Sequence, residues 1–280
     1  MPARKNPALP SHMLTESRDA PEAIARALAA DTATLQAIGQ SLRSQPPSGV
    51  LTVARGSSDH AAAYMAYLVM ARLGHLVTSL PMSLVTLYAS RLKCEGLLSL
   101  AFSQSGQSPD LVAPQQFFRQ GGARTVAIVN DAASLLAQAV QWVLPLHAGP
   151  EQSVAATKSY IAQLVAGARV VGHWQDDPAL LAALQALPEA LQRAVALDWQ
   201  PLVDALATAD RLFVIGRGLG QPIAQEAALK FKEVCGIQAE AFSGAEVRHG
   251  PMALIDEGYP LLVFAPPGAA QAGLLTLAAD

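Results

Sequence analysis

Short apolar runs alternate with longer stretches of helical periodicity through the first half of the chain. Each apolar run has the length of a strand, and the stretch that follows it carries apolar residues at helical spacing. Strands that alternate with helices in this way form βαβ units and a parallel sheet. The predicted strands are 49–54, 97–102 and 125–129, with a weaker fifth or edge strand at 141–146, and the predicted helices are 59–72 and 109–119.

A long helical pattern separates this region from a second set of strands. We predict one helix over 153–174 and then two helices within 176–208, broken near Pro188 and Pro201. The strand and helix alternation then resumes until the chain ends within a helical pattern. The predicted strands are 211–215, 237–242 and 261–265, and the predicted helices are 222–234 and a last one from Ala269 onward.

The two halves resemble each other at one kind of turn. Val50-Leu-Thr-Val-Ala-Arg-Gly56 and Leu212-Phe-Val-Ile-Gly-Arg-Gly218 both run from a strand through Arg-Gly into an alanine-rich helix. This repeat favours an α/β fold of two flavodoxin-like parallel-sheet domains, with helices on both faces, joined by a helical connector. The expected division is a disordered leader at 1–14, a first domain at 15–175, the connector at 176–208 and an incomplete second domain at 209–280.

Composition narrows the class of protein. Hydrophobic residues make up 51 % of the chain and charged residues 15 %, which is ample for buried strands under helices. The net charge of −3 and the absence of a Lys/Arg cluster argue against nucleic acid or an anionic membrane as a partner. No signal peptide or membrane-spanning run is found, so we expect a cytoplasmic protein in which Cys94 and Cys235 are reduced packing residues.

Ser103-Gln-Ser-Gly-Gln-Ser108 follows a buried strand and directly precedes a helix. Backbone N–H groups and the positive end of a helix meet at such a turn, which suits an anion. An ordinary polar turn with a serine cap is the alternative. Arg55-Gly-Ser-Ser58 follows the first strand, and parallel strands present their carboxyl ends on one side, so both loops could line one crevice. Two hydroxyl-rich loops favour a polyol phosphate over a dinucleotide.

Glu226, Lys230 and Glu233 are spaced to share one face of a helix. A solvent-facing ion pair of small energetic value is the alternative interpretation. His249 follows in Glu246-Val-Arg-His-Gly-Pro251, where a structural histidine would also be ordinary. A carbonyl-shifting enzyme needs a carboxylate to carry a proton between adjacent carbons and a group that opens the sugar ring. The six histidines and two cysteines show no metal-ligand spacing, so no metal and no cofactor are expected.

Taken together and in this order, the motifs resemble the isomerase half of glucosamine-6-phosphate synthase and the stand-alone deaminases of the sugar-isomerase (SIS) domain class. The resemblance runs from about Met13 to the end. The stretches that carry it are Arg55-Gly-Ser-Ser58, Ser103-Gln-Ser-Gly106, Glu151-Gln-Ser-Val-Ala-Ala-Thr-Lys158, Gly216-Arg-Gly218, Pro222-Ile-Ala-Gln-Glu-Ala-Ala-Leu-Lys-Phe-Lys-Glu233, Ala239-Glu-Ala241 and Glu246-Val-Arg-His-Gly-Pro-Met-Ala-Leu-Ile-Asp256.

The resemblance implies two SIS-type domains and a role for each matching position. Glu233 would move the proton between C1 and C2, Lys230 would assist at the neighbouring oxygens, and His249 would open the ring. In the family this histidine is delivered from the partner subunit, which implies a homodimer. The positions implied to bind the sugar phosphate are Ser58, Ser103, Gln104, Ser105, Ser108, Val154 and Glu226.

Three departures from the family pattern are visible. Ala156 stands where the family often has a hydroxyl, and Ser108 stands where the synthase has threonine. The family also ends in a tail with an imine-forming lysine, whereas this sequence stops at Asp280 within a predicted helix. An unfinished second sheet would expose an edge, so an extended chain is expected to be more stable.

Three functions remain open on the sequence alone. The first predicted strand begins at residue 49 and no cysteine follows Met1, so a glutaminase domain is not expected. The preferred hypothesis is therefore a glucosamine-6-phosphate deaminase that releases fructose 6-phosphate and ammonia. Simple aldose–ketose isomerisation is the second hypothesis, and a non-catalytic sugar-phosphate sensor is the third.

Overall fold

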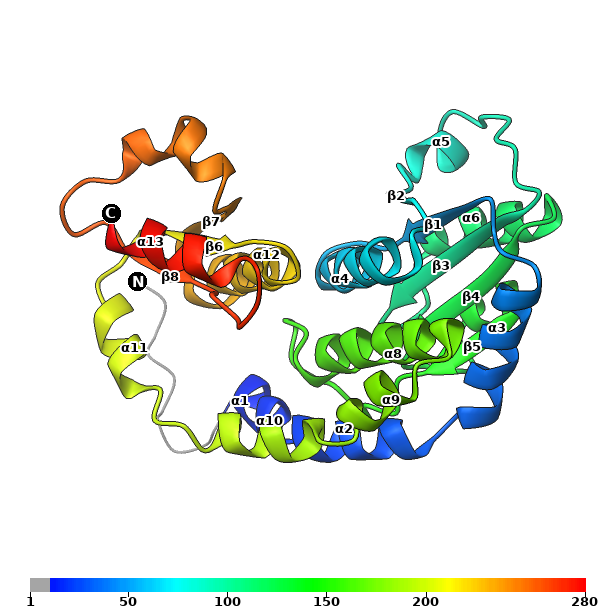
Figure 1. Cartoon of the computed structure of the whole chain (residues 1–280), viewed down its shortest axis with the longest axis horizontal. Helices are drawn as coiled ribbons and strands as arrows, with labels where there is room; N and C mark the ends of the chain where they lie inside the picture. Colours follow the sequence, from blue (N-terminus) through cyan, green and yellow to red (C-terminus); the bar gives the residue numbers. More distant parts are fainter. Residues whose placement is uncertain (1–10) are drawn as a thin grey trace.

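A computed structural model describes residues 11–280 and contains two parallel sheets of five and three strands (Figure 1). Each sheet lies between helices, and an arc of helices connects the two halves below them. The five-stranded sheet has the order β2-β1-β3-β4-β5, which is the flavodoxin-like order. Its strands are β1 (Gly49–Val53), β2 (Val77–Ser79), β3 (Leu97–Ser103), β4 (Arg124–Val129) and β5 (Trp142–Pro145).

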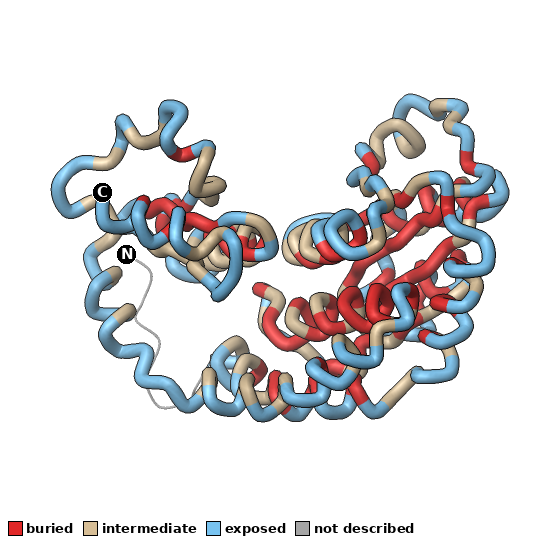
Figure 2. Tube along the Cα trace, viewed as in Figure 1, coloured by how far each residue is buried: buried red, intermediate tan, exposed pale blue. Residues whose placement is uncertain are grey.

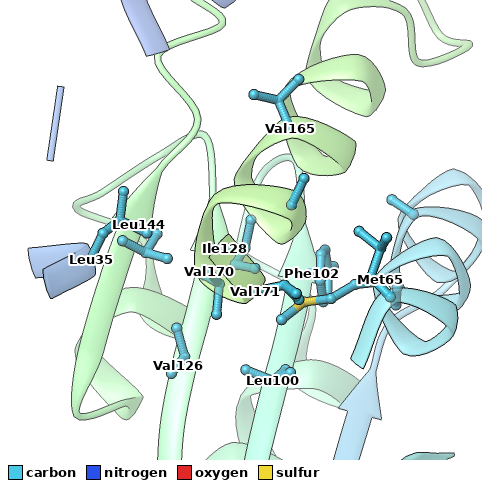
Figure 3. Packing of buried hydrophobic residues seen from close by; sticks show 14 of the residues in the cluster. Leu35, Met65, Leu100, Phe102, Val126, Ile128, Leu144, Val165, Val170 and Val171 are labelled. Carbon is cyan, nitrogen blue, oxygen red and sulfur yellow. The ribbon is translucent and has the colours of Figure 1, made fainter. Parts of the chain in front are cut away.

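Helices cover both faces of this sheet, so its strands are buried on both sides. Along β3, Leu98, Leu100 and Phe102 contribute to one core and Ala101 to the other, as the two-residue period of a strand requires. Figure 2 shows the burial concentrated in these strands, and Figure 3 shows Met65 of α4 packed near Phe102. The covering helices are α4 (Ser57–Leu73) and α8 (Lys158–Gln175) on one face and α6 (Pro109–Gln120) and α7 (Leu135–Ala139) on the other, with the short α5 (Ser83–Thr86) beside α6.

Three helices precede β1 and were not predicted: α1 (His12–Arg18), α2 (Ala20–Ala29) and α3 (Thr32–Ser44). Helices α2 and α3 pack against α8, and the buried Arg169 of α8 donates to backbone carbonyls at the end of α2, including that of Ala30 at 2.6 Å. The predicted disordered leader lies outside the described residues as far as residue 10. Its last part is wrong, because Ser11 caps α1 and His12 begins that helix.

The helical connector contains three helices rather than the predicted two: α9 (Pro178–Leu184), α10 (Leu187–Val195) and α11 (Gln200–Leu206). Each of them carries a proline in its first turn, where the missing N–H would have no partner. Pro188 and Pro201 therefore start helices instead of breaking them. The long helix predicted from residue 153 begins only at Lys158, because residues 151–157 form a loop.

The second sheet has the order β7-β6-β8, which repeats the β2-β1-β3 part of the first sheet. Its strands are β6 (Arg211–Gly216), β7 (Gln238–Ser243) and β8 (Leu261–Val263), and its helices are α12 (Gly220–Lys230) and α13 (Gln271–Ala279). Two 3₁₀ turns, Glu246–His249 and Pro251–Leu254, connect β7 to β8. Helix α12 contacts α4, so the two halves meet along these helices (Figure 1).

Two smaller predictions can also be compared with the structure. Cys94 is buried in the core on the α6 side of the five-stranded sheet. Cys235 is exposed, so the prediction of two packing cysteines is wrong for Cys235. Over residues 11–280, no helix has both the length and the apolar character needed to cross a membrane.

Candidate functional site

The loop after β3 winds its serines around a glycine. Gly106 has a φ of +63°, and its N–H donates to the Ser103 hydroxyl at 3.0 Å. The N–H of Gln107 donates to the Ser105 hydroxyl at 3.4 Å. Ser108 is the N-cap residue of α6, yet its side chain makes no capping hydrogen bond. The predicted phosphate loop therefore presents hydroxyl and amide groups at the positive end of α6.

A second loop, after β1, lies beside the serine loop. Arg55 donates to the Asp110 carboxylate in the first turn of α6 at 2.6 Å and so connects the two loops. Because β1 and β3 are neighbours in the sheet and the chain winds in opposite directions from them, the loops meet at the topological switch point. The loop that contains Ser58 and the serine loop therefore lie at the same edge of the sheet, as the sequence predicted.

A cavity of about 760 Å³ lies against the same serine loop on the side of β4 and β5. Gln104 and Ser105 line it from the loop, and Asn130 lines it from the end of β4. Asn130 fixes the opposite wall, since its side chain donates to the Gly149 carbonyl at 2.9 Å and accepts from the Ala148 N–H at 3.1 Å. Gln104 and Ser105 thus border open space, as a ligand-binding position requires.

The loop that contains Val154 is held by two carboxylates, the half-buried Glu151 and the buried Glu16. Glu151 accepts from the N–H and hydroxyl of Thr157 at 3.1 and 2.8 Å, and this closes the loop before α8. Glu16 of α1 accepts from the N–H of Ser153 at 3.1 Å. The Val154 side chain between these anchors is fully exposed and touches none of the other predicted site residues.

Glu226, Lys230 and Glu233 form a connected cluster, as their spacing predicted. The Lys230 ammonium lies 2.6 Å from Glu233 and 3.3 Å from Glu226. Glu233 belongs to a π-helical turn, Phe231–Cys235, that continues α12, and π turns are frequent at functional sites. Glu226 is only 5 % exposed, which excludes the alternative of a purely solvent-facing pair.

This cluster contacts the first domain at the loop after β1. Lys230 donates to the Ser57 hydroxyl at 3.1 Å, and Glu226 lies 2.8 Å from His60 of α4. The buried Gln163 of α8 donates to the Ser58 hydroxyl at 3.0 Å. The cluster on α12 and the hydroxyl loop of the first domain are therefore in direct contact.

Three buried polar atoms at this junction have no hydrogen-bond partner among residues 11–280: the Tyr160 hydroxyl, the Gln163 side-chain oxygen and the Glu226 oxygen that faces the Lys230 ammonium at 3.3 Å. Burial raises the pKa of the Tyr160 hydroxyl, and the neighbouring Glu226 and Tyr64 raise this pKa further. The phenol therefore remains a hydrogen-bond donor. Unpaired buried polar groups are costly, and they are commonly satisfied by a bound molecule or water.

His249 is the one predicted catalytic residue that the structure does not bring to the cluster. It lies exposed on the 3₁₀ turn after β7, and it has no hydrogen bond or ion pair with the rest of the described chain. His60, Tyr160 and Gln163 were missed by the sequence analysis. Gln163 alone left a signal, as a polar residue within the apolar pattern of α8.

The two parallel sheets, with the α12 cluster of the second unit in contact with the start of α4 in the first, define a doubly wound α/β protein of two units. The SIS domain sequence profile matches residues 46–171 and 205–277, so the chain belongs to the SIS domain family.

A curated glutamine–fructose-6-phosphate aminotransferase from Zymomonas mobilis is 38 % identical over 185 residues, which are 62 % of this chain and 30 % of that protein. The chain thus spans about a third of the length of this relative.

Two crystal structures extend the comparison. A candidate phosphosugar isomerase from Silicibacter pomeroyi DSS-3 has a TM-score of 0.92 and 43 % identity, over 96 % of this chain and 82 % of that one. The C-terminal domain of glucosamine-fructose-6-phosphate aminotransferase from Francisella tularensis has a TM-score of 0.82 and 23 % identity, over 99 % and 82 % of the two chains. At 23 % identity, the comparison with the Francisella domain supports the fold alone.

Proposed function

We propose that this chain is a phosphosugar isomerase whose reaction converts glucosamine 6-phosphate and water into fructose 6-phosphate and ammonia. The observation that carries the proposal is the ion pair of Lys230 and Glu233, with the Lys230 ammonium beside the Ser57 hydroxyl at the start of α4. The name of the Zymomonas relative, with fructose 6-phosphate as a substrate, supports the choice of sugar.

The serine loop would hold the phosphate through neutral donors and the helix end. Ser103, Gln104, Ser105 and Ser108 would supply these groups. Ser58 and the loop around Val154 would contact the sugar hydroxyls. A phosphate held at α6 leaves the other end of an extended hexose free to reach α12, where the carboxylates and the ammonium lie.

The chemical step is a proton transfer between two carbons. After ring opening, Glu233 would remove the proton from C2 of the open-chain amino aldehyde and deliver it to C1. Lys230 would stabilise the negative charge that develops on the O1 oxygen. The oxygen anion at O1 takes up a proton, and the C2 amino group loses one as it becomes an imine. Water then hydrolyses the imine, which gives the C2 ketone of fructose 6-phosphate and releases the nitrogen as ammonia.

His249 would assist ring opening from a second copy of the chain. Its exposed position on the 3₁₀ turn, away from the cluster of its own chain, is compatible with such delivery. The active species would then be a homodimer, and mixing His249→Ala and Glu233→Gln chains should restore part of the activity through hybrid dimers. A monomer with full activity would contradict this part of the proposal.

The test is ammonia release from glucosamine 6-phosphate, with fructose 6-phosphate followed in a coupled assay. Glu233→Gln should lower turnover by about 10²- to 10⁴-fold, the usual contribution of a positioned acid–base group, while sugar-phosphate binding persists. Glu189→Gln is the matched control, because this carboxylate lies exposed on α10 in a pair with Arg193. Equal turnover by both variants would overturn the assignment.

Aldose–ketose isomerisation without nitrogen is the second candidate, favoured by the likeness to the Silicibacter protein. The same proton transfer would interconvert glucose 6-phosphate and fructose 6-phosphate. Incorporation of solvent deuterium into these sugars, without any ammonia release from the amino sugar, would support this alternative over deamination.

A further inference from the structure

A second cavity lies in the C-terminal domain, away from the serine loop. Its volume is about 530 Å³, and it lies at the carboxyl ends of β6 and β7 and the start of α13. Tyr67 of α4 closes one side of it. The residues from the second domain that matter here are Arg217, Gly218, Gln221, Ser243 and Gly273.

This cavity lies at the carboxyl end of β6, which is the counterpart of β1 in the first sheet. Strand β6 lies between β7 and β8, as β1 lies between β2 and β3, so the second sheet has its own switch point beside β6. The turn after β6 carries Arg217 and Gly218, with φ of +59° at the glycine, and the turn after β1 carries Arg55 and Gly56, with φ of +55°. Ligands of open α/β sheets bind at such points.

The two arginines differ in their surroundings. Arg55 is neutralised by Asp110 in the first turn of α6 at 2.6 Å. Helix α13, the counterpart of α6, has no acidic residue in its first turn. In the part of the chain that the structure describes, Arg217 has no carboxylate partner, and no Asp or Glu lines the cavity. The exposed guanidinium therefore gives this cavity a net positive charge.

Two further groups describe what the cavity could accept. The Gln221 side-chain oxygen is buried without a partner among residues 11–280, so it can accept a hydrogen bond from a hydroxyl group. Gly273 lies in the first turn of α13, where N–H groups have no partner within the helix. A phosphorylated polyol carries both groups that would fit here: its phosphate would contact the Arg217 guanidinium and one of its hydroxyls would donate to the Gln221 oxygen.

We propose that the Arg217 cavity is a second, non-catalytic binding site for a hydroxyl-bearing phosphate ester such as a sugar phosphate. The serine-rich turn of the first domain has no counterpart after β8, where the chain reads Phe264-Ala-Pro-Pro-Gly-Ala-Ala270. The second site therefore depends on arginine and backbone groups instead of serine hydroxyls. Because Tyr67 belongs to the first domain, a ligand there would contact both domains.

Isothermal titration of the native chain with fructose 6-phosphate tests the proposal. We expect a second binding event per chain, weakened about 10- to 100-fold by Arg217→Ala, the loss expected for a charge-assisted hydrogen bond. Arg193→Ala removes an exposed arginine of α10 and should leave both binding events unchanged. A single event in the native chain, or a second event indifferent to Arg217→Ala, would overturn the site.

The nature of the ligand has its own test. Inorganic phosphate should bind at the Arg217 cavity more weakly than fructose 6-phosphate, and Gln221→Leu should remove most of this difference. Equal binding of the two probes would contradict the hydroxyl contact. All these readouts are binding measurements, so they hold whether or not the chain releases ammonia, and a failure of the proposed reaction would be seen separately.

Discussion

Gly106 is the residue on which the shape of the serine loop depends most. Its φ of +63° is unfavourable for any residue with a side chain, at about 1–2 kcal/mol. A Cβ at this position would lie 2.2 Å from the Ser134 hydroxyl. Ser134 is buried and caps α7 by accepting from the Ala137 N–H at 3.2 Å, and loss of such a cap costs about 1 kcal/mol. Gly106→Ala should therefore lower the free energy of unfolding by about 2–3 kcal/mol.

Urea unfolding and fructose 6-phosphate titration measure the two consequences of this change. Gly74→Ala is the matched control, because Gly74 has a φ of +71° but no atom within 4 Å of an added Cβ. The control should lose only about 1 kcal/mol of stability and keep its affinity for the sugar phosphate. Gly106→Ala should also bind more weakly, since its loop must shift. Equal stability losses and equal affinities in the two variants would show that the clash with Ser134 does not set the shape of the serine loop.

Three further predictions concern residues around the site. His60→Ala should lower turnover at least tenfold with little change in sugar-phosphate affinity, because it removes the side chain that holds Glu226. His60→Asn should restore part of the rate. An unchanged rate in His60→Ala would exclude a positioning role for His60. Lys158→Met should lower the free energy of unfolding by about 1–3 kcal/mol in urea, because it breaks the 2.6 Å pair between the buried Lys158 ammonium and the half-buried Asp19 carboxylate. An unchanged free energy of unfolding would contradict this. The Leu180 backbone N–H at the start of α9 lowers the pKa of Asp177. The ionised Asp177 carboxylate therefore stabilises the fold at pH values above the ordinary pKa of about 3.9, and this stabilisation is lost as the pH falls through the lowered pKa. An NMR titration of Asp177 with a midpoint at or above about 3.9 would contradict this prediction.

Much of the sheet architecture was accessible from the sequence. Strands such as β3 are buried on both faces, so they read as unbroken apolar runs that stand out between helical patterns. Helix starts were harder to predict. The predicted helical pattern before Lys158 falls in a loop that Glu151 holds locally and Glu16 holds from α1. A carboxylate of α1 that fixes a loop over a hundred residues later leaves no local signal.

The candidate site was predictable where its residues share one element and obscure where two elements meet. The spacing of Glu226, Lys230 and Glu233 placed them on one helical face, and the structure confirms that they contact one another. Whether that face was exposed depended on α12 packing against α4, which no local pattern encodes. The contact with His60 follows from this packing and therefore could not be predicted.

A crystal structure with fructose 6-phosphate is the most direct test of the central claim that one site spans the serine loop and helix α12. We expect the phosphate at Ser103–Ser108, with C1 and C2 of the sugar next to the Glu233 carboxylate and the Lys230 ammonium. A sugar phosphate bound with its phosphate elsewhere, or with C1 and C2 turned away from Glu233, would contradict the account.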